Sequence, residues 1–450
     1  MHNDFSSGSV SRRIISQAVP LTLAQITALL YNIVDRIYIG HLPGADSMAL
    51  TGLGLTFPIV TLVGAFTALF SSGGTPLFSI ARGAGEEEKA GRILGCTCAL
   101  LSLTSLLLMA LCYAARRPLL FLFGASEASY AYADAYLQIY LLGTPMAMLT
   151  TGLNGFINAQ GFARTGMLTT VLGAVINLIL DPLFIFVLDM GVRGAALATI
   201  ISQAVSCLWV LRFLCGRRVL IPIRRRHLRI DAALTRRIAV LGFSGFIMQG
   251  TNCLVQIACN STLYTFGGDL YVGVMTVINS VRSVLDMPVY GINHGAQPVI
   301  SFNYGAKRYD RVREAIRFTA LIGIAYTMLA WLFVLLRPQW LISIFSGDPD
   351  LVFVGEGALK VYFFGFFFMS FQFAGQTTFQ ALGYARYAIF FSLLRKAVIV
   401  VPLTLLLPRM GLGVMGVLVA EPISNAIGGL ACFTTMMLQV YRPLGKKQSR

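Results

Sequence analysis

The sequence predicts an all-α polytopic membrane protein with 12 transmembrane helices in two six-helix bundles. Of its 450 residues, 56% are hydrophobic and only 12% are charged, and the mean hydropathy is +0.73. Soluble domains carry about 25% charged residues, so this composition indicates a chain that crosses a bilayer many times. Two further observations, apolar runs of spanning length and an internal repeat, give the number of helices and their grouping.

The apolar runs are each long enough to cross about 30 Å of hydrocarbon at about 1.5 Å per helical residue. Several contain Gly or Pro, which membrane helices tolerate because neighbouring helices satisfy the freed backbone groups. We expect Pro20 and Pro182 to bend their helices. The predicted spans are 14–39, 49–79, 93–115, 133–158, 165–188, 194–215, 238–266, 271–301, 317–337, 352–380, 387–407 and 412–437.

The basic residues lie in short loops, mostly on one side of the predicted spans. A formal net charge of +16 could indicate nucleic-acid binding. The loop pattern instead follows the positive-inside rule, with attraction to anionic lipid as a by-product. We therefore expect the lipid bilayer and no nucleic acid as a partner, with both termini cytoplasmic. The cytoplasmic group comprises Arg12, Arg13, Arg82, Lys89, Arg92, Arg164, the runs 212–237 and 307–317, Arg386 and the tail 442–450.

Cysteine and histidine patterns predict neither an enzyme nor a protein with a bound cofactor or metal. Eight cysteines are scattered, mostly within the apolar runs, without redox or zinc spacing. The sequence contains no His-Glu-x-x-His and no Walker phosphate loop.

An internal repeat divides the chain into two similar halves. A shift of about 222 positions aligns Gly73-x-x-Pro76 with Gly295-x-x-Pro298, and three other separate blocks align at the same offset. Each half has six predicted spans, so the halves share one orientation, as in transporters whose two bundles rock around a central site. The sequence thus predicts an N-terminal lobe at 1–215, a basic cytoplasmic linker at 216–237 and a C-terminal lobe at 238–450.

Asp35 lies in the last third of the first predicted span. A charged side chain there costs at least about 2.5 kcal/mol, so it is expected to face a protein interior or a wet cavity. In the alternative interpretation, Asp35 already lies in the outer headgroup region.

Four side chains are predicted to lie at a similar depth to Asp35. Asn177 and Asp181 share a helix face at i, i+4 spacing, and Thr199 and Tyr140 enter from the outer surface on neighbouring spans. Together these oxygens would suit a proton or a hard monovalent cation. Alternatively, Asn177 and Asp181 mend the helix that Pro182 breaks.

The second half lacks this set, because Asp181 aligns with Leu403 and Thr199 with Glu421. We expect structural ion pairs instead, with a working site as the alternative. Glu421 is predicted to pair with Lys360 or Arg395, and Arg282 with Asp286. Three glutamines are candidates for lining a cavity for amphipathic ligands, namely Gln256, Gln372 and Gln376.

Several stretches resemble the MATE (multidrug and toxic compound extrusion) transporters, most closely the bacterial MepA-like and DinF-like branches. They are LLYNIVDRIYIGHLPG, NAQGFARTGM, NLILDPLFIF, HGAQPVISFNYGA and GLGVMGVLVAEPIS, and the likeness covers nearly the whole chain. The resemblance implies a bacterial cytoplasmic-membrane antiporter, working as a monomer, that exports bulky organic cations in exchange for H+ or Na+. It assigns coupling roles to Asp35, Asn177, Asp181 and Thr199.

One departure from the family argues against a cation site in the second half and against the substrate specificity of the NorM branch. The NorM branch carries acidic residues in the seventh and tenth spans, where this chain has Asn252, Gln256 and Gln372.

A lipid-linked oligosaccharide flippase of the same superfamily is the alternative function. Such a flippase usually needs a strongly cationic central cavity, whereas the charges predicted within these spans are few and of both signs.

Overall fold

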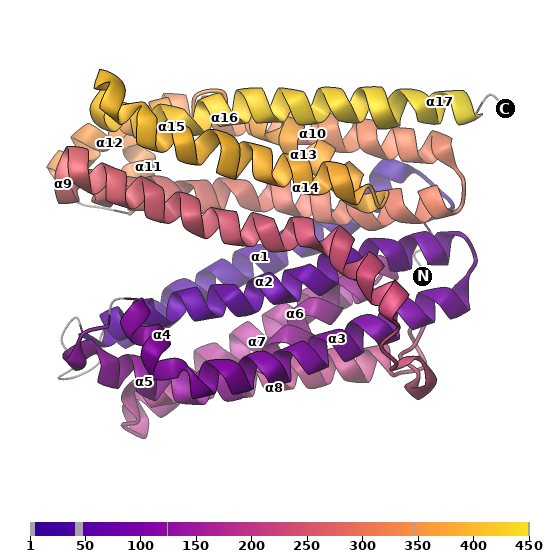
Figure 1. The fold of residues 1–450 in the computed structure, drawn as a ribbon, viewed down its shortest axis with the longest axis horizontal. Helices are drawn as coiled ribbons and strands as arrows, with labels where there is room; N and C mark the ends of the chain where they lie inside the picture. Colours follow the sequence, from indigo (N-terminus) through magenta and orange to yellow (C-terminus); the bar gives the residue numbers. More distant parts are fainter. Residues whose placement is uncertain (1–4, 41–47, 124, 346–347, 449–450) are drawn as a thin grey trace. The chain divides into compact units, whose positions relative to one another are not determined.

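The computed structural model is built almost wholly from helices (Figure 1). It describes residues 5–40, 48–123, 125–345 and 348–448, and no β-strand occurs among them. In this described part, eight helices are long and apolar enough to cross a membrane. The predicted all-α membrane fold is therefore confirmed.

Contacts within the chain divide it into two compact units. Unit 1 contains Leu23–Gly242, and unit 2 contains Phe5–Thr22 together with Phe243–Arg450. The predicted linker 216–237 thus lies inside unit 1, while the first part of the first helix belongs to unit 2. A division by contacts does not test which segments move together, so the lobes 1–215 and 238–450 remain a prediction.

Unit 1 holds most of α1 and the helices that follow it. Short helices, α4 (Arg116–Leu122) and η2 (Arg225–His227), lie in connecting segments. The long elements are α1 (Val10–Gly40), α2 (Met48–Gly83), α3 (Glu87–Ala114), α5 (Glu127–Leu142), α6 (Thr144–Ala159), α7 (Ala163–Pro182) with η1 (Leu183–Val187), and α8 (Gly191–Leu214).

Unit 2 holds most of α9 (Ala232–Gly305) and all later helices. The first of these are α10 (Tyr309–Leu336), α11 (Pro338–Ser343), α12 (Pro349–Tyr362) and α13 (Phe368–Ala381). The remaining elements are α14 (Ala385–Leu393), η3 (Leu394–Val400), α15 (Val401–Leu406), η4 (Pro408–Leu412), α16 (Gly413–Met436), η5 (Met437–Tyr441) and α17 (Arg442–Gln448).

Glycine positions account for the differences between the predicted spans and the helices. The fourth predicted span is two helices that meet at Gly143, and the tenth is broken by a turn containing Gly365, at φ 67°. The seventh and eighth form one run, α9, with a backbone break at Gly268, at φ 66°. Both Gly365 and Gly268 adopt the left-handed region that favours glycine.

The backbone confirms the internal repeat. Residues with positive φ recur at the same offset in both halves: Gly161 (φ 89°) with Gly383 (φ 77°), and Gly191 (φ 55°) with Gly413 (φ 52°). Two further pairs, Gly85 with Lys307 and Asp189 with Gly411, follow the same rule. The helix ends of one half are therefore repeated in the other at the level of individual dihedral angles.

One carbonyl accepts a side-chain hydrogen bond in both halves, although the donors are not equivalent. In unit 1 Arg82 Nη1 donates to the carbonyl of Ala159 at 2.8 Å. In unit 2 Ser301 Oγ donates to the carbonyl of Ala381, the repeat equivalent of Ala159, also at 2.8 Å. Each bond satisfies a carbonyl at the end of a helix, where no intrahelical donor is available.

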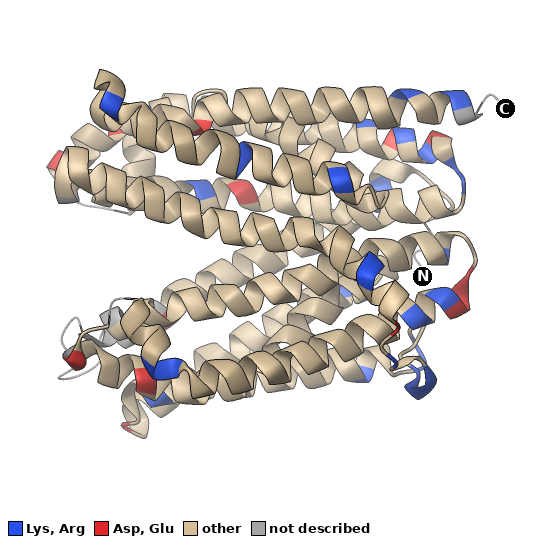
Figure 2. Cartoon of the chain, viewed as in Figure 1, with Lys and Arg blue, Asp and Glu red and all other residues tan. Residues whose placement is uncertain are grey.

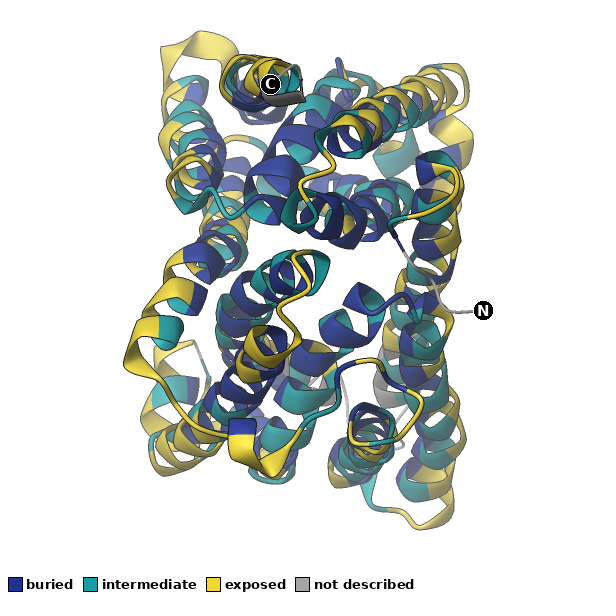
Figure 3. Cartoon of the chain, turned by 90° about the vertical axis from the view of Figure 1, so that its right-hand side faces the viewer, coloured by how far each residue is buried: buried dark blue, intermediate teal, exposed yellow. Residues whose placement is uncertain are grey.

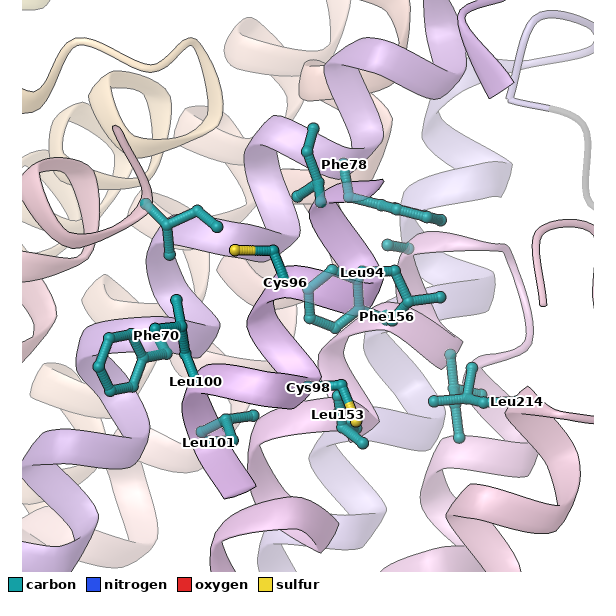
Figure 4. Close-up of a cluster of buried hydrophobic side chains, with 14 of the residues drawn as sticks. Phe70, Phe78, Leu94, Cys96, Cys98, Leu100, Leu101, Leu153, Phe156 and Leu214 are labelled. Carbon is teal, nitrogen blue, oxygen red and sulfur yellow. The ribbon is translucent and has the colours of Figure 1, made fainter. Parts of the chain in front are cut away.

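Close packing between helices forms the core of unit 1 (Figure 4). The rings of Phe78 and Phe156 meet edge to face, with centroids 5.3 Å apart. A Cβ on Gly74 would lie 2.5 Å from Thr97 Oγ1, so glycine permits this approach of α2 and α3. Because lipid is as apolar as such a core, close van der Waals contact is what stabilises helix association here.

The outward faces of the helices are apolar. On α3, Leu103, Leu106, Leu107 and Leu111 are each more than half exposed. Seen along the helices, exposed residues occupy loops and outer faces, while buried residues face other helices (Figure 3). A water-soluble protein rarely exposes so much apolar surface, so these faces suit contact with lipid.

Charged residues gather at the helix ends. In unit 1, Lys and Arg concentrate near the α2–α3 turn and the segment that precedes α9 (Figure 2). In unit 2, they concentrate near the α9–α10 turn and along α17. This distribution agrees with the positive-inside pattern on which the predicted orientation rests.

Candidate functional site

The first candidate site lies inside unit 1, where α1 and α7 present carboxylates. We call it the carboxylate site and define it by Asp35, Asn177, Asp181, Thr199 and Tyr140. Asp181 and Asn177 are only 1% and 2% exposed. Asn177 Nδ2 donates to Asp181 Oδ1 at 3.3 Å, because i, i+4 spacing stacks the two side chains on one face of α7.

The structure brings Asp35 to this pair. Its carboxyl group lies close enough to the Asp181 carboxyl group for the two to interact electrostatically. Two carboxylates so close repel each other in a buried site unless a proton or a cation lies between them. The predicted proximity of Asp35 to Asp181 and Asn177 is therefore found.

Hydroxyl groups border the two carboxylates. Thr199, on α8, donates its hydroxyl to the carbonyl of Ala195 at 3.0 Å, which leaves its oxygen available to accept. Tyr136 lies beside both Thr199 and Asp35 and stacks on Tyr140, with ring centroids 5.7 Å apart. The predicted residues Thr199 and Tyr140 thus lie at the border of the site.

Sequence reasoning missed two tyrosines of this site. Tyr31 precedes Asp35 by one helical turn and lies near both carboxylates. Tyr136 precedes Tyr140 by one turn. The i, i+4 rule that united Asn177 and Asp181 would have found both, had it been applied to the other two helices.

The two prolines that were predicted to bend their helices lie in different surroundings. Helix α7 ends at Pro182 and continues as the π-helical turn η1, closed by Leu188 N donating to the carbonyl of Leu183 at 2.9 Å. Proline removes a backbone donor and thereby favours such a change of helix geometry. Pro20 lies inside α1, and the chain passes from unit 2 to unit 1 between Thr22 and Leu23.

The second candidate site is a cavity of about 280 Å³ inside unit 2, which we call the basic cavity. Its lining combines charged groups with tyrosine and phenylalanine rings and side-chain amides. The residues on which the argument depends are Arg282, Asp286, Arg395, Lys396, Glu421, Tyr290, Tyr362, Phe373, Asn252, Gln256 and Asn279.

Three cationic side chains converge on one carboxylate oxygen in this cavity. Glu421 Oε1 lies 2.7 Å from Arg282 Nη2, 3.5 Å from Arg395 Nη1 and 3.4 Å from Lys396 Nζ. Glu421 is 4% exposed, and the side chains of Arg395 and Lys396 are each 9% exposed. The predicted Arg395–Glu421 pair is confirmed as part of a larger network.

The network extends to neighbouring polar groups. Arg282 Nε donates to Asp286 Oδ2 at 3.3 Å, which confirms the predicted pair, and Arg282 also donates to the Tyr362 hydroxyl. Arg395 donates to Asn425 Oδ1. Sequence reasoning missed Lys396 as a partner of Glu421, although it adjoins Arg395.

The predicted Lys360–Glu421 pair is wrong. Lys360 Nζ contacts Glu356 Oε1 at 2.6 Å, one helical turn earlier on α12. Glu356 lies at i, i+4 spacing from Lys360 on the same helix, so this ion pair forms without any tertiary contact.

Two of the three predicted cavity glutamines lie elsewhere. Gln256 lines the basic cavity, but Gln372 and Gln376 are buried between α13 and α14. Gln376 Nε2 donates to the carbonyl of Ala388 at 2.8 Å, and its repeat equivalent Asn154 donates to Gly166, the equivalent of Ala388. Gln372 Nε2 donates to the carbonyl of Phe391 at 3.4 Å. Gln376 therefore serves a helix contact common to both halves.

Within the described part of the chain, no group of three or more His, Cys, Asp or Glu side chains is placed to hold a metal ion. The carboxylate site offers two carboxylates, with neutral oxygens beside them.

Two parallel repeats of six spans, with a polar site buried in each unit, form an architecture that is found among secondary transporters. The chain matches the MatE family model over residues 20–183 and again over 246–406, once in each half. It belongs to the MatE family of multidrug efflux transporters. The predicted resemblance to MATE transporters and to the MepA-like branch is thus confirmed.

Similar proteins span almost the whole chain. The multidrug export protein MepA of Staphylococcus haemolyticus is 25% identical over 433 residues, which cover 93% of this chain and 92% of MepA. A protein of Shewanella oneidensis named FAD transporter is 25% identical over 456 residues, covering 95% and 94%. A crystal structure of MATE in the bent conformation aligns with a TM-score of 0.90 and 22% identity over 98% of each chain, which confirms the twelve-helix fold.

Proposed function

We propose that the protein is a secondary active antiporter that exports amphipathic compounds in exchange for H+ or Na+. The observation that carries this proposal is the pair of neighbouring, interacting carboxyl groups, Asp35 and Asp181, inside unit 1 of a MatE-family chain. In our proposal it works as a monomer in a bacterial cytoplasmic membrane, with both termini cytoplasmic and with no cofactor.

The carboxylate site supplies the coupling chemistry. Burial and mutual repulsion disfavour two ionised carboxylates, so binding of one proton or one monovalent cation relieves both penalties. The surrounding donors are oxygens, which suit a hard cation as well as a proton. Ion entry from outside therefore stabilises the state in which the site is occupied.

Exchange follows from differential affinity. A ligand shifts a conformational equilibrium only by as much as its affinities for the two states differ. Ion and exported compound favour opposite states, and the two lobes rock between them, with a bend at Pro20 changing the course of α1. Each ligand thereby lowers the affinity for the other by the same factor.

The substrate class follows from two considerations. The family resemblance predicts bulky, mostly cationic compounds, and MepA is named a multidrug export protein. The relative named FAD transporter indicates that compounds with phosphate groups also belong among the candidates. The shared property is an amphipathic molecule with a large ring system.

Transport by the purified protein in proteoliposomes tests this proposal. The vesicles hold a fluorescent amphipathic compound, and an H+ gradient, a Na+ gradient or neither is imposed. Export is expected under one gradient and is expected to fall to background in the Asp35→Asn, Asp181→Asn double variant. Asp134→Asn is the matched control, because it makes the same change at a carboxylate that pairs with Arg116 at 2.8 Å and is not one of the residues that define the site. Undiminished gradient-driven export by the double variant would refute the proposal.

The flippase alternative has one observation in its favour, the three cationic side chains of the basic cavity. Two carboxylates in the same cavity offset most of that charge, which weakens the case for a pyrophosphate. Movement of a fluorescent lipid-linked pyrophosphate between leaflets, with no gradient-driven export of amphipathic dyes, would favour the flippase.

A further inference from the structure

We propose that the basic cavity of unit 2 binds the acid group of an exported aromatic acid, a compound that joins a ring system to a carboxylate or phosphate. This inference rests on the proposed export function and names a substrate class for it. It also differs from the expectation of mostly cationic substrates, because the cavity has an excess of positive charge, which attracts anions and repels cations.

The charges in the cavity wall do not balance. Three cations, Arg282, Arg395 and Lys396, face two carboxylates, Asp286 and Glu421, which leaves an excess of one positive charge among the described lining residues. Buried charge is costly unless it is paired. A single anionic group in the cavity would restore neutrality.

One of the three cations, Lys396, lacks a close acceptor of its own. Charge-assisted N–H···O contacts are usually about 2.7–2.9 Å long. Arg282 meets this standard with Glu421 Oε1 at 2.7 Å, and Arg395, which is 3.5 Å from that atom, donates to Asn425 Oδ1 instead. Lys396 reaches Glu421 Oε1 only at 3.4 Å. That atom already accepts from Arg282. Lys396, with three N–H donors, therefore has donor capacity that an acid group can use.

The remaining lining suits the rest of an aromatic ligand. Tyr290, Tyr362 and Phe373 supply ring surface, and Tyr290 and Phe373 meet edge to face with centroids 5.1 Å apart. Asn252, Gln256 and Asn279 supply neutral polar groups. Polar and charged groups make up a larger share of this lining than is usual in small-molecule sites, which suits a ligand with an acid group. The volume of 280 Å³ is close to the lower end of the range for such sites, about 300 Å³.

A cationic substrate fits this cavity poorly. Its charge would add to the existing excess, and to reach Glu421 it would compete with Arg282 at 2.7 Å. The cavity thus discriminates by charge, with attraction for acids and repulsion for cations.

Two dyes that differ at one group test the inference. Rhodamine 123 is the methyl ester of rhodamine 110, so the pair shares its fluorophore and differs only in a free carboxylate. Binding to the purified full-length protein is measured by fluorescence anisotropy without any ion gradient. We expect rhodamine 110 to bind about tenfold more tightly, as one charge-assisted contact allows. Fluorescein, a dianion on the same ring skeleton, is expected to bind at least as tightly as rhodamine 110.

Variants assign the preference to the cavity. Lys396→Gln should bring the affinity ratio of the two rhodamines close to one, and Lys396→Arg should restore it. Lys360→Gln removes the same charge outside the cavity and should leave the ratio unchanged. The comparison of dyes on the unmodified protein needs no variant, so a folding defect in Lys396→Gln leaves the test intact.

Two results would overturn the inference: equal or weaker binding of rhodamine 110 by the unmodified protein, or an unchanged ratio in folded Lys396→Gln. The outcome is separable from that of the antiport proposal. Binding without a gradient reports only on the cavity, whereas loss of gradient-driven export reports on the carboxylate site.

Discussion

The two units build different sites from equivalent positions. Tyr140 of unit 1 corresponds to Tyr362 of unit 2, and both lie at their sites. Thr199 corresponds to Glu421, and Asp181 corresponds to Leu403. The positive-φ conformations at Gly161 and Gly191 thus recur at Gly383 and Gly413, whereas the buried charged residues of the two sites differ. Duplication preserves helix packing, and a few buried side chains set each site's chemistry.

The difference in charge predicts a division of labour. In unit 1 two carboxyl groups face each other, which favours a bound proton or cation. In unit 2 three cations share one carboxylate oxygen, which favours a bound anion. Our proposals therefore assign ion coupling to this level of the repeat in unit 1 and substrate recognition to the same level in unit 2.

The largest expected effect on stability comes from Glu421. Replacing it with Gln leaves three buried cations without their shared carboxylate, which should lower the free energy of unfolding by about 3–5 kcal/mol. Glu356→Gln, also a carboxylate-to-amide change in unit 2, should have little effect because that pair is partly exposed. Denaturant titration of the purified variants measures both. An equal free energy of unfolding for Glu421→Gln and Glu356→Gln would show that Glu421 does not stabilise the network.

The repeated glycines should respond alike. Gly161→Ala and Gly383→Ala each force a side chain into the left-handed region and should each lower the free energy of unfolding by about 1–2 kcal/mol. Gly250→Ala is the control, since it lies inside α9 with open space around it. Effects of different size at Gly161 and Gly383 would argue that the repeat is not maintained at these helix ends.

The smallest expected effects separate packing from recognition. Gln376→Ala and Asn154→Ala each remove an equivalent interhelical hydrogen bond and should cost about 1 kcal/mol of stability. Neither should alter the preference for rhodamine 110. Gln256→Ala, within the basic cavity, should change dye affinity and leave unfolding almost unaltered. A changed preference in Gln376→Ala would place Gln376 in the binding site after all.

Much of the fold was predictable from local signals. Apolar length gave the spans, and Gly and Pro blocks at one offset gave the repeat, because both depend on residues close in sequence. The break at Gly268 and the interruption at Gly365 need a positive φ, which glycine permits but does not dictate. The positions of these two helix breaks could therefore be found only from the structure.

The two sites differed in how far they could be predicted. Asp35, Asn177 and Asp181 were found because a carboxylate within an apolar run is costly and conspicuous. The basic cavity was only partly found, because Lys396 and Glu421 meet through tertiary packing rather than along one helix. Lys360 illustrates the opposite error, since its partner lies one turn away on its own helix.

The most direct test of this division of labour is the gradient-driven export of rhodamine 110 and rhodamine 123 by two variants in parallel. Asp181→Asn should abolish gradient-driven export of both dyes and retain the binding preference for rhodamine 110. Lys396→Gln should keep gradient-driven export and lose the preference. Loss of both properties in both variants would contradict the account, because the two units would then form one undivided site.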